Sequence, residues 1–296
     1  MMRHLPLFAL LVGATVSRPA HAQSVDPALD VGVRLVLADA PVLDDDLVAD
    51  SDAVSLRLAP SVVLGGEGWY VSAASNNRFI RYLDDDRDDR WRRTQRLEAG
   101  SRSAGAFDVL GYVERGDDLA TAEFSDTDQW EAGARVERRF GAEHRLRLGG
   151  AWRWRDYADF DRSQGEGPEA RIDYRYRIAA NHYVGATLVA ERIDSDNERR
   201  RFDRIVTSLA YTRPVAADLR VRPQLSYRAL DYPGRPVPGL VDTVREDRVW
   251  LPELTVLYSP GDFLITGEFQ SILRRSTDPT FDENGYRLGA EIGVEF

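Results

Sequence analysis

Arginine and acidic residues recur at every second position of several segments, and this spacing decides what chemistry the chain can offer. The segment Arg171–Arg177 reads Arg-Ile-Asp-Tyr-Arg-Tyr-Arg. Successive side chains of a β-strand point to opposite faces, so the segment predicts a strand with one charged face and one apolar face. A face of guanidinium and carboxylate groups can steer anions or sugars, and it can equally form cross-strand ion pairs.

The same charged face can be followed through most of the chain, and it predicts the lining of a lumen. The residues assigned to this lining are Arg34, Arg57, Arg135, Arg145, Arg147, Arg153, Arg171, Arg175, Arg177, Arg220, Arg222, Arg228, Glu131, Glu137, Asp173, Glu268, Arg287 and Glu291. Arg155, Glu191 and Glu295 share the pattern. Two interpretations stay open: an electrostatic lining that steers solutes, or a wall of ion pairs that stiffens the fold. One lining can serve both purposes.

The sequence offers little for catalysis. Beyond residue 22 the histidines are His144 and His182, both at predicted turns, whereas nucleophilic catalysis needs a base beside its nucleophile. No G-x-S-x-G motif, phosphate-binding loop or histidine metal motif occurs. The chain also contains no cysteine, which excludes disulfides and thiolate metal sites. We expect neither an enzyme nor a cofactor.

Three groups of aspartates lie in predicted polar connections: Asp84–Asp89, Asp117–Asp118 and Asp194–Asp196. Carboxylates are the ligands that divalent cations prefer, so these groups could share cations with lipopolysaccharide. Solvated loop charge explains them more simply. The prediction is therefore that the chain has no metal site.

The elements that would position the charged face are clearest in Tyr286–Phe296, where every even position is apolar and the odd positions are charged or glycine. About fourteen segments of roughly ten residues follow this rule, which matches a tilted crossing of the hydrocarbon layer. Tight connections such as Gly65–Gly68 and Ala180–Asn181 alternate with long polar ones such as Asp231–Glu246. Short periplasmic turns and long external loops are typical of outer-membrane barrels.

The predicted fold is therefore all-β, a transmembrane antiparallel up-and-down β-barrel of about 14 strands. Closure would satisfy every backbone group inside lipid. A secreted β-sandwich or solenoid is the rival, but neither predicts loop lengths that alternate along the whole chain. About eight strands are already filled by side chains, so about fourteen leave room for a lumen.

The N-terminus indicates the compartment. Arg3 and His4 precede an apolar run, Leu5–Val16, and then Ala20-His21-Ala22. This is the pattern of a secretory signal peptide over residues 1–22, cleaved before Gln23, which leaves 23–296 as one barrel domain. The apolar run is too short to cross a membrane as a helix. The formal net charge of -10 argues against nucleic-acid binding.

Aromatic residues gather near the predicted strand ends, where interfacial girdles contact lipid and lipopolysaccharide headgroups. A sugar-stacking track is the alternative for any that face inward. The aromatic residues concerned are Trp69, Tyr70, Trp91, Trp130, Trp152, Trp154, Tyr174, Tyr176, Tyr227, Trp250, Tyr258 and Phe296. We expect the barrel assembly machinery to recognise the chain through Phe296.

Both ends of the predicted mature chain resemble the β-barrel porin 2 family. The opening carries Ser51-Asp52, Leu58-Ala59-Pro60, Trp69 and Arg81-Tyr82. The closing hairpin carries Arg274–Pro279, Phe281-Asp282 and Tyr286–Gly289. The resemblance implies an outer-membrane channel that accompanies exopolysaccharide export, with export components as partners. The hairpin is also similar to the barrel of surface lipoprotein assembly modifiers, but their helical repeats have no counterpart before the first predicted strand.

These observations predict a monomeric barrel in the outer membrane of a Gram-negative bacterium. We expect a passive, porin-like conduit for hydrophilic solutes or secreted polysaccharide. The first rival is a non-conducting barrel that anchors a surface export machine for polysaccharide or lipoprotein, and the second is a barrel enzyme. A lumen fully bridged by arginine and glutamate would favour the anchor.

Overall fold

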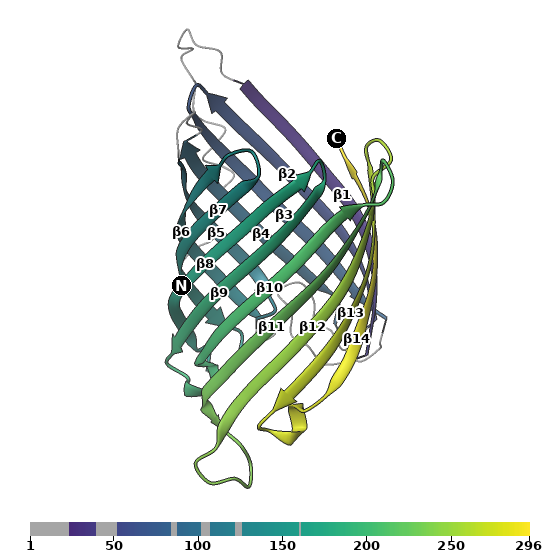
Figure 1. Ribbon diagram of the computed structural model, residues 1–296. Helices are drawn as coiled ribbons and strands as arrows, with labels where there is room; N and C mark the ends of the chain where they lie inside the picture. The colour runs from purple at the N-terminus through teal and green to yellow at the C-terminus, as the bar shows by residue number, and fades with distance from the viewer. Residues whose placement is uncertain (1–23, 40–51, 84–87, 102–106, 122–125, 160) are drawn as a thin grey trace.

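The computed structural model describes residues 24–39, 52–83, 88–101, 107–121, 126–159 and 161–296. Within them, fourteen antiparallel strands form one closed barrel (Figure 1). The strands are β1 (Ser24–Asp39), β2 (Ala53–Gly66), β3 (Trp69–Tyr82), β4 (Arg90–Ser101), β5 (Asp108–Leu119), β6 (Thr127–Phe140), β7 (His144–Tyr157), β8 (Gln164–Ala179), β9 (His182–Ser195), β10 (Phe202–Pro214), β11 (Leu219–Pro236), β12 (Val244–Tyr258), β13 (Phe263–Ser276) and β14 (Asn284–Glu295).

Each strand pairs with its neighbours in sequence, and a seam between β1 and β14 closes the ring. At this seam Val31 lies opposite Val294, and Leu35 lies opposite Ala290. Leu29 and Phe296 exchange two backbone hydrogen bonds of 3.1 and 2.9 Å. A closed ring has no unpaired edge, as a sheet in lipid requires. The predicted fold class and strand number are confirmed.

The exterior of the barrel is apolar because alternate side chains of every strand point outward. Val33 and Leu35 of β1 and Leu209 of β10 are 51, 41 and 58 % exposed, whereas Arg34 between the first two is 12 % exposed. An apolar surface that surrounds the whole molecule matches a hydrocarbon layer and not water. No helix in the described part of the chain is long and apolar enough to cross a membrane.

The two ends of the barrel differ in their connections. At the turn end, five connections of two to four residues join β2–β3, β6–β7, β8–β9, β10–β11 and β12–β13. Gly68 and Asn181 adopt φ of 80° and 55° there, a left-handed conformation that glycine and asparagine tolerate best. The connections at the loop end are longer, and β14 ends at the turn end (Figure 1). Short turns face the periplasm in outer-membrane barrels.

The predicted strand limits are wrong at the loop end, where strands continue into segments predicted as loops. Strand β5 extends to Leu119 and β11 to Pro236, so the strands have 12 to 18 residues and not about ten. Ion pairs between neighbouring strands stabilise the additional strand residues. Arg93 contacts Asp117 at 2.8 Å, and Arg248 contacts Asp231 at 2.6 Å. Above the hydrocarbon layer both faces of a strand can be polar, so an apolar alternation no longer marks the strand.

The lumen face is not polar throughout, which the sequence pattern did not predict. Seven lumen-facing apolar residues on β9 to β13 form one cluster near the loop end. Its members are Ile193, Phe202, Leu230, Tyr232, Val249, Leu251 and Ile272. A smaller cluster joins Val36, Ala53, Ile80 and Tyr82.

Two short 3-10 helices at the loop end, η2 (Glu198–Arg200) and η3 (Pro279–Phe281), contact side chains of the mouth. Arg235 Nε donates to the carbonyl of Arg199 in η2 at 2.8 Å. The Phe281 ring in η3 lies 3.4 Å from the Arg245 guanidinium. These external loops therefore narrow the mouth on the side of β11 to β13.

Candidate functional site

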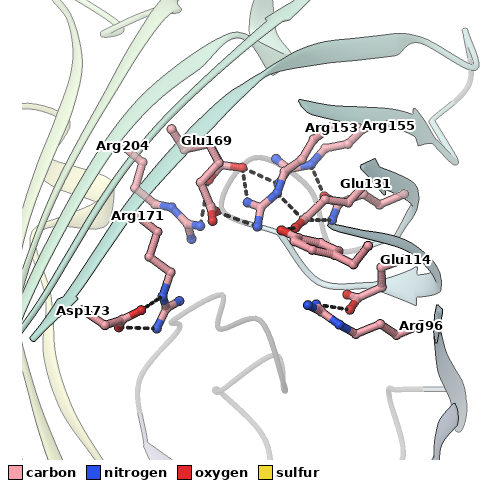
Figure 2. Close-up of polar contacts among 12 residues, drawn as sticks. Arg96, Glu114, Glu131, Arg153, Arg155, Glu169, Arg171, Asp173 and Arg204 are labelled. Carbon is pink, nitrogen blue, oxygen red and sulfur yellow. Dashed lines mark hydrogen bonds and ion pairs between the residues drawn. The ribbon is translucent and has the colours of Figure 1, made fainter. Parts of the chain in front are cut away.

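A row of seven charged side chains crosses one wall of the lumen, one from each strand of β4 to β10. Figure 2 labels six of them: Arg96, Glu114, Glu131, Arg153, Glu169 and Arg204. The strand register places Arg96 opposite Glu114, Glu131 opposite Arg153, and Glu191 opposite Arg204. Glu169 completes the row, which we call the wall network. Because these side chains share one face of the sheet at one level, each lies within reach of its neighbours.

Glu191 is the centre of the wall network. Its side chain has no exposed surface and accepts hydrogen bonds or ion pairs from Arg153 at 2.5 Å, Arg155 at 2.7 Å and Arg204 at 2.7 Å. Arg153 also contacts Glu131 at 2.7 Å and Glu169 at 2.6 Å. The last contact matters because Glu169 lies directly opposite Glu191, and like charges so placed repel. Arg153 compensates this repulsion.

A second group of ion pairs lies on the other side of the lumen, across the seam. Glu268 on β13 accepts from Arg34 at 3.0 Å and from Arg287 at 2.7 Å. Arg57 on β2 contacts Glu291 on β14 at 2.9 Å. Gly32 leaves space for these side chains, since a Cβ atom there would lie 3.0 Å from a Glu291 oxygen. The pairs thus join strands on both sides of the closure.

Six arginines line one cavity near the turn end, and four of them have no carboxylate within ion-pair distance among the described residues: Arg135, Arg145, Arg175 and Arg222. Arg145 and Arg175 even lie opposite each other on β7 and β8. The guanidinium of Arg175 lies 4.4 Å from the centre of the Tyr183 ring, and Arg222 donates to Gln224 Oε1 at 2.7 Å. The cavity has a volume of about 280 Å³. This part of the lumen carries an excess of positive charge.

The residues predicted to line the lumen fall into separate groups of contacts in the structure. Glu131 and Arg153 belong to the wall network, and the predicted residues of β1, β2, β13 and β14 belong to the seam group. Arg228 lines a cavity together with Arg153 and Arg204 of the wall network. Toward the turn end, Arg147 pairs with Glu137 and Arg171 pairs with Asp173.

Several charged lumen residues escaped the sequence prediction. They are Arg96, Glu114, Glu169, Arg204, Arg245, Asp247 and Arg274. Glu169 could have been found by extending the alternation of Arg171 and Asp173 backwards by one step. Arg96 lies in a strand whose alternation is weak, and no sequence signal marks its partner Glu114.

The histidines occupy positions in an aromatic belt at the turn end. A ring nitrogen of His144 lies 2.7 Å from the Tyr174 hydroxyl, and one of His182 lies 2.8 Å from the Tyr211 hydroxyl. The His144 ring also stacks on Tyr176, 4.9 Å between centroids. Among the described residues neither histidine contacts a serine or a carboxylate.

Among the predicted loop carboxylates that the structure describes, Asp117 and Asp118 form ion pairs, whereas Asp196 accepts hydrogen bonds from the backbone N–H groups of Gln164 and Asn197, each at 2.8 Å. Asp117 pairs with Arg93 and Arg115, and Asp118 pairs with Arg90. The described part of the chain contains no group of three or more histidine, aspartate or glutamate side chains arranged to hold a metal ion. Residues 84–87 of the first aspartate group and the predicted signal peptide lie outside the described residues.

Comparisons with known proteins relate the chain to solved structures. No protein-family model and no curated protein matches it. An anion-selective porin from Comamonas acidovorans superposes with a TM-score of 0.56 at 10% identity, covering 93% of this chain and 100% of the porin. The outer membrane channel DcaP of Acinetobacter baumannii gives 0.55 at 10% identity, with 93% and 97% covered.

A third similar structure, described as a bacterial polysaccharide outer membrane secretin, gives a TM-score of 0.52 at 10% identity and covers 91% and 98% of the two chains. At such identities the likeness concerns the fold. The closed ring, the apolar exterior and the unequal connections agree with it. The chain has the fold of the outer-membrane β-barrel porins and channels, and its place is the outer membrane of a Gram-negative bacterium.

Proposed function

We propose that the chain is a porin-like channel that lets hydrophilic solutes cross the outer membrane passively. One observation carries the proposal: among the described residues, the ion pairs of the wall network and of the seam group run around the wall and not across the lumen. Arg153 reaches no further than two strands away, to Glu191, and Arg34 reaches Glu268, also two strands away. A lumen lined in this way keeps its centre available for water and solute.

Cavities inside the barrel support the same reading. One of about 680 Å³ lies near the turn end between β3 and β7, with Tyr70, Glu98 and Arg135 in its lining. Polar walls with fixed charges replace part of the hydration of a passing solute and select by charge. Such a wall needs no bound cofactor.

Secreted polysaccharide is included in the proposed cargo. The resemblance of both chain ends to the β-barrel porin 2 family supports it, as does the structural neighbour described as a polysaccharide secretin. The neighbour described as anion-selective supports passage of small anions. We also propose that the barrel is monomeric, contacts lipopolysaccharide, and is recognised by the assembly machinery through Phe296, which is 75 % exposed.

A non-conducting anchor for an export machine is the second candidate. The apolar cluster on β9 to β13 and the loops against the mouth favour it, because both reduce the open cross-section. Conductance separates the two candidates directly.

The test is single-channel recording of the refolded mature chain in a planar bilayer, with selectivity measured under a salt gradient. We expect discrete, stable openings with a preference for anions. Exchanging both Arg175 and Arg222 for glutamine should lower that preference, because two unpaired cations leave the lining. Arg275→Gln is the control, since Arg275 is 73% exposed and pairs with Asp282 at the loop end. A silent bilayer, from protein shown to be folded, would refute the channel.

A further inference from the structure

We propose that the turn end of the lumen contains a defined binding site for multivalent oxyanions, such as phosphate groups or clustered carboxylates. The four arginines without carboxylate partners form it: Arg135, Arg145, Arg175 and Arg222. This inference rests on the proposed function in one respect, because it places the site along the route of the solute. The chemistry of the site follows from its residues alone.

Two small residues, Gly185 and Ala210, form the floor of the site and lie between Arg175 and Arg222. Gly185 on β9 lies opposite Arg175 on one side and opposite Ala210 on the other. Ala210 lies on β10, and the neighbouring strand β11 carries Arg222, which lines the same cavity. A Cβ atom built on Gly185 would meet nothing closer than the Tyr174 carbonyl at 3.8 Å, so the floor is open. Small residues on β9 and β10 thus leave a bay between the guanidinium groups.

The charge balance of this bay is strongly positive. Its lining includes six arginines and one carboxylate, Asp173. That carboxylate already accepts from Arg171 at 2.8 Å and from the Thr187 hydroxyl at 2.9 Å. Arg147 is engaged by Glu137 outside the bay. No carboxylate of the described lining remains for the other four arginines.

Two features show that the arrangement is unsatisfied without an anion. Arg145 and Arg175 face each other across adjacent strands, where like charges destabilise the pairing. The Nε atom of Arg222 is buried and has no hydrogen-bond partner among the described residues. The wall network has many more carboxylates, and there Arg153 alone contacts three. An oxyanion in the bay would supply the missing acceptors.

The ligand class follows from the donors and the volume. Guanidinium groups bind carboxylate and phosphate oxygens through paired, charge-assisted hydrogen bonds. The cavity of about 280 Å³ has room for roughly nine water molecules at about 30 Å³ each. That space fits one phosphate-sized group with some hydration, or one acidic sugar unit. Four cations favour an anion that carries two or more charges over chloride.

The test is isothermal titration calorimetry of the mature chain refolded in detergent, at low ionic strength, with sodium tripolyphosphate and inorganic phosphate as probes. We expect saturable binding, tighter for tripolyphosphate than for phosphate. The double variant Arg175→Gln, Arg222→Gln should weaken binding at least tenfold. Gly185→Val keeps every charge and fills the floor, so it should weaken binding by a similar factor.

Two further variants make the experiment decisive. Arg275→Gln changes the net charge at the loop end and should bind within twofold of the unmodified chain. Ala210→Leu fills the same floor from β10 and replaces Gly185→Val if that variant does not fold. Circular dichroism and gel mobility without heating report the folded barrel in each case.

The outcomes test the oxyanion site and the channel separately. Absent binding, or equal affinity in the unmodified, floor-filled and arginine-depleted chains, would overturn the site, because the anion would then be held only by diffuse charge. Binding in a barrel that does not conduct would support the site and refute the channel. Conductance in a barrel that binds neither probe would refute the site and leave the channel intact.

Discussion

At the scale of single residues, Glu191 is the most deeply buried carboxylate of the wall network, and three guanidinium groups contact it. Removing one partner from a buried ionic network leaves uncompensated charge and costs about 3–5 kcal/mol. We therefore expect Glu191→Gln to lower the free energy of unfolding by about that amount, measured by urea titration of the barrel in lipid vesicles.

The control for this change is Asp282→Asn, which breaks the exposed pair with Arg275. Exposed pairs contribute about 0–1 kcal/mol, so the expected effect is small. Equal losses in the two variants would mean that the wall network adds no more stability than a surface ion pair.

Asp159, between β7 and β8, gives the loop end a dependence on pH. Burial alone would raise the pKa of its carboxyl, but hydrogen bonds from the Ser163 hydroxyl and backbone N–H, and the Arg200 guanidinium, hold that pKa below its ordinary value of 3.8. A lowered pKa stabilises the folded loop above pH 3.8, and this contribution is lost as the pH falls below that value.

We expect the loop around Asp159 to become more accessible to an acid-stable protease such as pepsin below about pH 3.8, while the strands stay protected. Asp159→Asn should make cleavage of this loop nearly independent of pH in the same range, because the group no longer titrates. Unchanged pH dependence in that variant would contradict the assignment.

Alternation in the sequence predicted one shared face for residues such as Arg153 and Arg34, but it missed others such as Arg96 and did not predict any ion-pair partner. The partners of Arg153 depend on the registers between β6, β7, β8 and β9, and one sequence contains no information on register beyond the alternation itself. The unpaired state of Arg145 and Arg175 depends on register in the same way.

At the scale of strands and connections, the sequence predicted the turn end better than the loop end. Gly68 and Asn181 adopt positive φ angles that glycine and asparagine tolerate well, so the residue types alone predict these turns. At the loop end the strands continue through runs such as Asp231–Pro236, whose charges and proline resemble a loop. Pairing with β12 decides their conformation, and local propensity does not.

A substitution on β10 tests which face contacts lipid. Leu209, near the middle of the strand, is 58 % exposed on the exterior, whereas the adjacent Ser208 faces the lumen. Leu209→Arg should destabilise the folded barrel by about 2–4 kcal/mol in a bilayer, the cost of arginine near the midplane. Ser208→Arg should cost clearly less because water can solvate the lumen side. Equal costs, measured by urea titration in vesicles, would contradict the assigned faces.

At the scale of the whole molecule, the net charge of the chain is negative, but the arginine-lined bay near the turn end is positive. A solute in the lumen experiences the charges that lie within the screening distance. The chain has a formal charge of -10. Screening limits electrostatic reach to about 8 Å at physiological ionic strength. A strand of 14 residues spans about 46 Å at about 3.3 Å per residue, so the two ends of the barrel are electrically separate. Selectivity should therefore follow the lumen arginines and not the net charge.

The seam between β1 and β14 has a consequence for how the chain reaches its native state. Every other strand pair can form between neighbours in sequence, but this one joins segments at opposite ends of the polypeptide. Contacts so distant along the chain form slowly, because the entropy of closing a long loop opposes them. Until ring closure, two sheet edges and the apolar exterior are open to aggregation. The chain is therefore most prone to aggregation while it folds. A barrel with this topology must be shielded from other chains until β14 pairs with β1.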